Sequence, residues 1–318
     1  MKADKILCRG SWSSIHGAGK EEHILSMITI ENDQFSAEIN RLGAELTTLT
    51  RKADGRQYIW NDTEGKYWGR HAPILFPSIG KSNNDQYTLA GDKFGMKQHG
   101  FARDYEFSSV TKEGTNSVTL TQHANGETEA SYPFAYALSV TYTLTASGLE
   151  VSYTVANGDD KPMPFALGSH PGFALSQPLE NYTVTVNGAK TPLTKFGIGP
   201  VPFRNGAVEP FTEAKGNTVP LSHELLDDGL IIINAPEATS ATLAANDGSY
   251  SVELSLQDFP YLTLWSPEHK NAPFVCVEPF NGLPDQAADA PTDWFKKAGN
   301  TTLAANASAT FGYTATLN

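Results

Sequence analysis

Residues 138–155 read LSVTYTLTASGLEVSYTV, and this stretch decides the fold. Apolar and polar side chains alternate along its two arms, which is the pattern of strands with one buried and one solvated face. The segment Ala146-Ser147-Gly148 between the arms is a turn signal, so the stretch predicts an antiparallel hairpin. The apolar positions are Leu138, Val140, Tyr142 and Leu144 in the first arm and Leu149, Val151, Tyr153 and Val155 in the second.

The same alternation continues on both sides of this hairpin. It recurs at residues 182–186, 250–256 and 311–317 with turn clusters between the runs, whereas helical periodicity is nearly absent. Only residues 292–297 are expected to form a short helical turn, with Thr292 or Asp293 as its N-cap. Many short strands without long helices predict an all-β fold, a large antiparallel β-sandwich with very little helix.

The first 26 residues differ from the rest of the chain. They show neither strand nor helix periodicity and lack the apolar core of a secretory signal, so we expect a disordered extension followed by a single domain over residues 27–318. One hypothesis is that Met27 is the native initiator and that residues 1–26 do not belong to the native protein. The alternative is an ordinary disordered tail.

Charge and cysteine content limit the classes of partner. The 318 residues include 23 Lys and Arg against 35 Asp and Glu, a formal net charge of −12. An acidic chain without basic clusters argues against nucleic acid or a membrane surface as partner, and no apolar run is long enough to span a membrane. Two cysteines, Cys8 and Cys276, make no disulfide framework, which favours a reducing compartment and hence the cytoplasm. The partner class left is a neutral small molecule; the oligomeric state is not predicted.

Three titratable side chains occur within glycine-rich or apolar sequence. His99 lies in Q-H-G-F, His170 in G-S-H-P-G-F and Glu278 in F-V-C-V-E-P-F. Glycine next to a histidine permits close approach of another molecule to the backbone. Each histidine could equally be a hydrogen-bonded core residue. A fourth unusual segment, residues 67–81, is rich in aromatic residues and proline and carries Arg70 and Lys81.

Glu278 is expected to end an apolar strand. On that strand it shares a face with Phe274 and Cys276, while Val275 and Val277 point to the other side. A carboxylate among apolar neighbours loses hydration, which raises its pKa toward the range useful for proton transfer near neutral pH. The alternative is that Glu278 points into solvent at the strand end.

Several chemistries lack their usual motifs. The sequence contains no H-x-H, H-E-x-x-H or C-x-x-C, no phosphate-binding loop and no G-x-S-x-G elbow, so we expect neither a metal nor a cofactor. The remaining candidates are imidazoles and one carboxylate. They favour acid/base chemistry on a neutral molecule.

The unusual segments, taken in order, resemble the aldose 1-epimerase (galactose mutarotase) family, in particular its bacterial branch associated with lactose and galactose genes. The matching segments are W-N-D, Y-W-G-R-H-A-P-I-L-F-P-S-I-G-K, Q-H-G-F-A-R-D, G-S-H-P-G-F and V-E-P-F-N-G-L-P-D, and the likeness runs from about residue 27 to the end of the chain. The resemblance implies a galactose mutarotase-like supersandwich with a sugar-binding cleft. It also implies an isomerase that interconverts the α and β anomers of a free hexose without a cofactor or metal.

The resemblance assigns roles to particular residues. Glu278 corresponds to the catalytic base, His170 to the catalytic acid, and His99 to the second histidine, which binds and polarises the sugar. The family's sugar-binding arginine falls at Lys81, which cannot make the forked hydrogen bonds of a guanidinium, so Arg70 is a substitute candidate. The sugar-binding aspartate corresponds to Asp228, with the adjacent Asp227 as the alternative.

Two other functions remain alternatives. One is a non-catalytic sugar-binding protein of the same fold, suggested by lysine at the arginine position. The other is a mutarotase for hexose 6-phosphates, which would need a cationic pocket for the phosphate. The sequence does not identify the preferred aldose, because selectivity depends on hydroxyl partners on loops.

Overall fold

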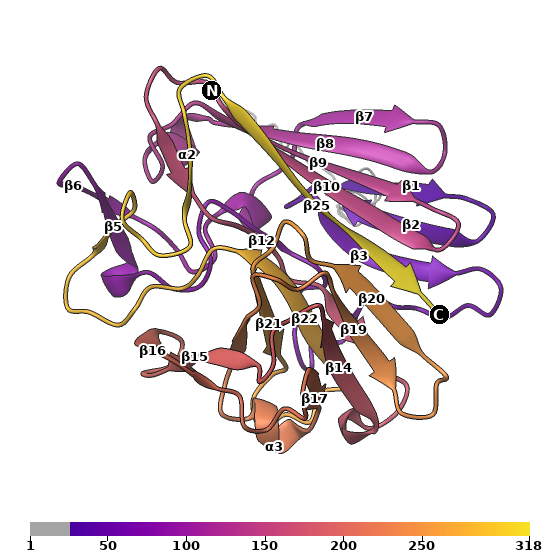
Figure 1. Cartoon of the computed structure of the whole chain (residues 1–318). Coiled ribbons are helices and arrows are strands. Elements are labelled where there is room, and N and C mark those ends of the chain that lie inside the picture. Colours follow the sequence, from indigo (N-terminus) through magenta and orange to yellow (C-terminus); the bar gives the residue numbers. More distant parts are fainter. Residues whose placement is uncertain (1–25) are drawn as a thin grey trace, which may run out of the picture.

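A computed structural model describes residues 26–318, and nearly all of its regular structure is β. Two large sheets form the body of the molecule (Figure 1). Every strand pair is antiparallel except β23 with β5, which confirms the predicted antiparallel β-sandwich. Residues 1–25 of the N-terminal extension lie outside the described residues, so the disorder expected there stays a prediction. Strand β1 begins at Met27, and the single domain over residues 27–318 stays a prediction.

The first large sheet has nine strands in the order β17-β14-β19-β20-β25-β10-β9-β8-β7. The predicted hairpin forms β9 and β10, next to the central strand β25, and Leu144 pairs with Leu149 and Leu138 with Val155. The strands are β7 (Ser109–Glu113), β8 (Ser117–His123), β9 (Tyr136–Leu144), β10 (Gly148–Asn157), β14 (Tyr182–Asn187), β17 (Thr218–Pro220), β19 (Ser240–Ala245), β20 (Ser251–Ser255) and β25 (Ser308–Leu317).

The second large sheet has eight strands, seven of them in the order β16-β15-β18-β21-β22-β12-β4, with β13 also paired to β22. The strands are β4 (Ile74–Leu75), β12 (Leu167–Ser169), β13 (Gly172–Ala174), β15 (Thr194–Ile198), β16 (Arg204–Pro210), β18 (Ile231–Asn234), β21 (Tyr261–Trp265) and β22 (Phe274–Asn281). This sheet is the one that carries the candidate site.

Smaller elements complete the fold. The remaining strands are β1 (Met27–Glu31), β2 (Phe35–Asn40), β3 (Glu45–Arg51), β5 (Gln86–Leu89), β6 (Asp92–Gly95), β11 (Met163–Phe165), β23 (Thr292–Asp293) and β24 (Thr301–Leu303). The helical elements are α2 (Gly126–Glu129), α3 (His223–Leu226) and the 3-10 turns η1 (Asn83–Asp85), η2 (Ala102–Asp104) and η3 (Leu179–Asn181).

The helical turn predicted at residues 292–297 is wrong. Thr292 and Asp293 form β23, which pairs with β5, and a non-helical turn follows. The side chain of Asp293 accepts a hydrogen bond from the amide of Phe295, so the capping chemistry is present without the helix. Pairing with a strand two hundred residues away outweighed the local preference.

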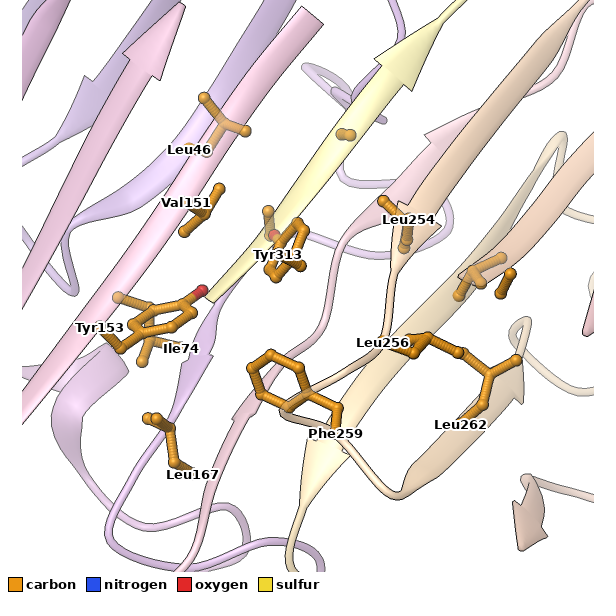
Figure 2. Close-up of a cluster of buried hydrophobic side chains, with 14 of the residues drawn as sticks. Leu46, Ile74, Val151, Tyr153, Leu167, Leu254, Leu256, Phe259, Leu262 and Tyr313 are labelled. Atoms are coloured by element: carbon orange, nitrogen blue, oxygen red, sulfur yellow. The ribbon is translucent and has the colours of Figure 1, made fainter. Parts of the chain in front are cut away.

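The core lies between the two large sheets. Figure 2 shows Val151 of β10 and Tyr313 of β25 facing Leu167 of β12 and Leu262 of β21. Strand β22 is buried on both faces: Val275 and Val277 pack in this core, while Phe274 and Cys276 pack on the outer side. Since neighbouring residues of a strand point to opposite faces, Glu278 lies on the outer side as well.

Candidate active site

A cavity of about 440 Å³ opens on the outer face of the eight-stranded sheet, within the size range of small-molecule sites. It contains all three residues that the family resemblance assigned to catalysis. The lining residues are Trp68, Arg70, Gly80, Gln98, His99, Arg103, His170, Val201, Pro202, Leu230, Thr263, Trp265, Glu268, Glu278, Phe280 and Pro284.

The side chains of His170 and Glu278 meet at the base of this cavity. Nε2 of His170 lies 3.3 Å from Oε2 of Glu278, and the two residues are 8% and 1% exposed. The β22 ladder places Glu278 opposite Thr263 of β21, whereas His170 follows β12 and donates its backbone amide to Pro73 O. The two side chains form a buried dyad held by the central strands of the sheet.

Tryptophan rings surround the imidazole of His170. Trp68 stacks on it at 5.0 Å between ring centroids, and Trp265 meets it edge-on at 5.7 Å. Behind it, Ser169 on β12 hydrogen-bonds the hydroxyl of Tyr313 on β25 across the core. Packing from both sides therefore fixes the orientation of His170.

Burial shifts the pKa values of the dyad in opposite directions. Loss of hydration raises the pKa of Glu278 well above 4.5. It lowers the pKa of His170 to about 3, assisted by the positive charges of Arg103 and Arg70. Both shifts favour the uncharged forms. Over a wide pH range the dyad therefore holds one proton between the two groups, and that proton can move in either direction.

His99 is held by reciprocal contacts with Gly80. The amide of Gly80 donates to Nδ1 of His99 at 3.2 Å, and the amide of His99 donates to Gly80 O at 2.8 Å. With Nδ1 as acceptor, the proton of the neutral ring is on Nε2. Burial and the neighbouring His170 and Arg103 keep the pKa of His99 well below 6.5. His99 thus presents a neutral hydrogen-bond donor, with its ring centroid 5.7 Å from that of His170.

Backbone geometry explains the glycine after His99. His99 itself has φ +65°, unusual for a residue with a side chain. Gly100 has φ +72°, and a Cβ there would overlap the carbonyl of Phe76. The glycine after His99 therefore allows the close approach of the protein's own backbone at Phe76, and not that of another molecule.

Two arginines line the cavity. Arg70 forms an ion pair with Asp104 at 2.6 Å and donates to Arg103 O. Arg103 donates to Gln98 O, and no carboxylate in residues 26–318 lies within ion-pair distance of it. Sequence reasoning missed Arg103, although it stands four residues after His99 in the matched segment Q-H-G-F-A-R-D.

Lys81 and Asp228 are placed outside the cavity lining. Lys81 lies 3.6 Å from Asp85 and is not among the residues that line the dyad's cavity, although its neighbour Gly80 is. Asp228 is exposed and borders a different hollow between β15, β18 and α3. The structure therefore brings Arg70, and not Lys81 or Asp228, to the dyad.

Glu268 is a carboxylate of the cavity that the sequence did not single out. It accepts a hydrogen bond from Nε1 of Trp265 at 3.1 Å. The next residue, His269, donates its amide to Asp227 at 2.6 Å, which ties this loop to the segment after α3.

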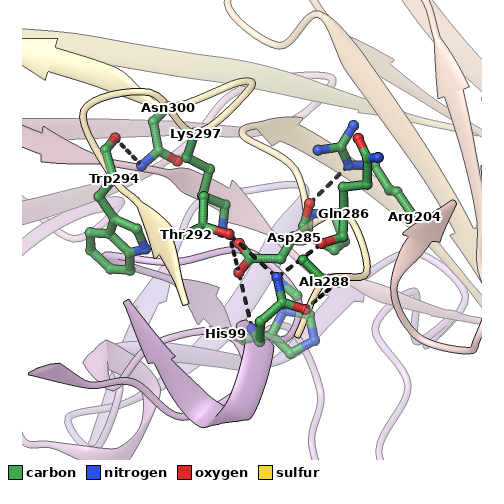
Figure 3. Close-up of polar contacts among 12 residues, drawn as sticks. His99, Arg204, Asp285, Gln286, Ala288, Thr292, Trp294, Lys297 and Asn300 are labelled. Atoms are coloured by element: carbon green, nitrogen blue, oxygen red, sulfur yellow. Dashed lines mark hydrogen bonds and ion pairs between the residues drawn. The ribbon is translucent and has the colours of Figure 1, made fainter. Parts of the chain in front are cut away.

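A buried ion pair between Lys297 and Asp285 lies next in sequence to Pro284, a residue of the cavity lining (Figure 3). Nζ of Lys297 lies 2.9 Å from Oδ1 of Asp285, and both side chains are almost fully buried. The other oxygen of Asp285 accepts from the amide of Asn83 and the hydroxyl of Thr292. Asp285 follows Pro284, which packs against Gly80. The pair thus supports the loop that holds His99.

Comparison with known proteins agrees with this geometry. A galactose mutarotase-like protein from Lactobacillus casei is 54% identical, with a TM-score of 0.89 over 92% of this chain and 100% of that one. A galactose mutarotase related enzyme from Lactobacillus acidophilus is 29% identical, with a TM-score of 0.83 over 92% and 97%. Protein LacX of Lactococcus lactis subsp. lactis is 29% identical over 269 residues, 80% of this chain and 88% of LacX.

The fold and the cavity define a large antiparallel β-sandwich of the galactose mutarotase-like class, with a buried histidine–carboxylate dyad. The model of the aldose 1-epimerase family matches residues 26–314. The chain belongs to the aldose 1-epimerase family. No helix in the described part of the chain combines the length and apolar character needed to cross a membrane.

Proposed function

We propose that this protein is an aldose 1-epimerase that interconverts the α and β anomers of a free hexose. The observation that carries the proposal is the buried contact between His170 and Glu278, 3.3 Å apart in the cavity. Anomer exchange needs one group to take a proton from the anomeric hydroxyl while another gives a proton to the ring oxygen. Both oxygens are bonded to the same carbon, so two proton-transfer groups close together can reach them at the same time.

The reaction consists of ring opening and ring closure. In the form of the dyad that has its shared proton on His170, the Glu278 carboxylate takes the proton of the O1 hydroxyl as the His170 imidazolium protonates the ring oxygen; the C1–O5 bond breaks and C1 becomes an aldehyde. Rotation about the C1–C2 bond turns the other face of the aldehyde toward O5. Closure then reverses the two proton transfers and returns the dyad to its starting state, so no net proton is consumed.

His99 and Arg70 are proposed to hold the sugar. Because Gly80 occupies Nδ1, the Nε2 proton of His99 is the donor left for a substrate, beside the side-chain amide of Gln98 at 3.3 Å. Arg70 offers a guanidinium that its ion pair with Asp104 keeps in place. The rings of Trp68 and Trp265 supply apolar surface against which a pyranose face can pack.

The identity of the hexose is part of the proposal. Galactose and glucose are the candidates: relatives are described as galactose mutarotase-like, and the cavity suits a neutral polyhydroxylated ligand. A cytoplasmic location and a role in galactose metabolism are proposed with it.

One observation favours a second candidate, a hexose 6-phosphate. Arg70 and Arg103 both line the cavity, and Arg103 has no carboxylate partner among the described residues. A guanidinium is well suited to bind phosphate. If Arg103 faces the C6 substituent, the protein would accelerate the mutarotation of hexose 6-phosphates more than that of free hexoses. If Arg103 does not face it, the acceleration would be smaller for the phosphates.

The test is polarimetry of freshly dissolved α-galactose, α-glucose and glucose 6-phosphate, with and without protein. Faster relaxation of a free hexose supports the proposal. Acceleration confined to the phosphorylated sugar would support the second candidate. Sugar binding in calorimetry with no change in relaxation rate would contradict catalysis and support the non-catalytic sugar-binding alternative.

A further inference from the structure

Three potential metal ligands converge at the base of the cavity. A ring nitrogen of His170, the thiol of Cys276 and a carboxylate oxygen of Glu278 all lie within 4.8 Å of one another, and all three residues are buried. Cys276 and Glu278 are two residues apart on β22 and point to the same side of the sheet. His170 reaches them from the segment between β12 and β13.

The donor set suits a borderline-soft divalent cation. Zinc binds sulfur at about 2.3 Å and nitrogen or oxygen at about 2.0–2.2 Å in a tetrahedron, which places neighbouring ligand atoms about 3.5 Å apart. His170 and Glu278 already have 3.3 Å between their closest ligand atoms. The thiol of Cys276 lies within 4.8 Å of both ligand atoms. Thiolate and imidazole favour zinc over magnesium or calcium, which prefer oxygen ligands.

One carboxylate oxygen at this point is left without a protein partner. Oε1 of Glu278 is buried without a hydrogen-bond partner. His170 and Glu278 line the cavity, while Cys276 packs behind them with Phe274, Trp68 and Trp265. Three protein ligands leave one position of a tetrahedron for a further ligand.

We propose that His170, Cys276 and Glu278 form an inhibitory site for Zn²⁺ or a similar soft divalent cation. Binding releases the thiol proton and the proton shared by the dyad, so that one dication, one thiolate, one carboxylate and one neutral imidazole make an uncharged complex. The dyad then holds no transferable proton. Zinc binding stands on the geometry alone, whereas inhibition rests on the proposed mutarotase function.

The experiment titrates chelator-treated full-length protein with ZnCl₂ in a calorimeter. Every protein carries Cys8→Ser, so that the only thiol is that of Cys276. We expect one zinc per chain, bound at least about tenfold more weakly by Cys276→Ser, since loss of even an outer-sphere partner costs 10–100-fold. His269→Ala is the control, because His269 and Asp227 form an exposed pair that could bind zinc at the surface; its affinity should match that of the parent.

A second measurement does not depend on how the variants fold. Cobalt(II) bound to a thiolate gives a charge-transfer band in the near ultraviolet, and the parent protein should show this band on adding CoCl₂. Absence of the band, absence of zinc binding, or equal affinity in Cys276→Ser would each overturn the site. Zinc binding through Cys276 in a protein that does not accelerate mutarotation would uphold the site and overturn only the proposed function.

Discussion

The amide of Gly80 donates a hydrogen bond to Nδ1 of His99, with 3.2 Å between the nitrogens. This contact sets the tautomer of a cavity residue through the backbone of a neighbouring loop. Gly80 has φ +68°, and a Cβ there would overlap the ring of Pro284. The position therefore requires glycine for two reasons, one conformational and one steric.

Gly80→Ala should lower kcat/KM by about tenfold to a hundredfold, because displacement of His99 by a fraction of an ångström weakens its hold on the sugar. Polarimetry with varied sugar concentration measures this. Gly65→Ala is the matched control: Gly65 has φ +64° and no atom within 4 Å of the added Cβ. Gly65→Ala should lower the free energy of unfolding by about 1 kcal/mol through backbone strain and leave kcat/KM unchanged. Equal kinetics in both variants would contradict the role of Gly80.

Lys297→Met should destabilise the protein by about 3–5 kcal/mol, because it leaves the buried carboxylate of Asp285 without its cation. Urea denaturation measures the free energy of unfolding. The double variant Lys297→Met/Asp285→Asn should recover part of the loss. The control is Lys296→Met, which removes the exposed pair with Asp293 and should cost less than about 1 kcal/mol. A loss as small as that of the control would show that the buried pair does not anchor the loop.

The rate should depend on pH through the proton count of the dyad. Below the lowered pKa of His170, about 3, the dyad holds two protons, and above the raised pKa of Glu278 it holds none. The active form holds one, so kcat/KM should be flat across this interval and fall as pH rises through the pKa of Glu278. Polarimetry over pH 4 to 9, with the spontaneous rate subtracted, measures the profile. A bell-shaped profile of kcat/KM against pH, with its limbs at the ordinary pKa values of 4.5 and 6.5, would contradict the pKa shifts by burial.

Arg70→Met should raise KM by about tenfold to a hundredfold, the cost of one hydrogen bond from a charged group, about 1.5–3 kcal/mol. Lys81→Met should leave KM unchanged, because its ammonium lies outside the cavity beside Asp85. The comparison of the two variants decides whether Arg70 or Lys81 binds the sugar. A larger effect at Lys81 would support the position to which the family resemblance assigned the arginine.

Local patterns predicted the fold and part of the site. Alternation over residues 138–155 predicts the β9–β10 hairpin because register and burial are set within the segment itself. The face of β22 that carries Glu278 follows from the same period of two. These features need no knowledge of distant residues.

Long-range placement could not be predicted. Lys81 and Arg70 stand in one loop segment, and only the packing of that loop against Pro284 and Asp104 decides which side chain reaches the cavity. Arg103 was overlooked for the same reason. The cluster of His170 and Cys276 joins segments more than one hundred residues apart, so searches for adjacent metal-binding motifs could not detect it.

In the proposed reaction, Glu278 shares a transferable proton with His170 to exchange anomers. The most direct measurement is the relaxation of optical rotation of fresh α-galactose with wild type and with Glu278→Gln, which keeps the shape of the side chain. Glu268→Gln is the control, a cavity carboxylate that bonds to Trp265 instead of His170. The account predicts acceleration by wild type, a loss of about 10²–10⁴-fold in Glu278→Gln and a smaller loss in the control. Full activity of Glu278→Gln would contradict it.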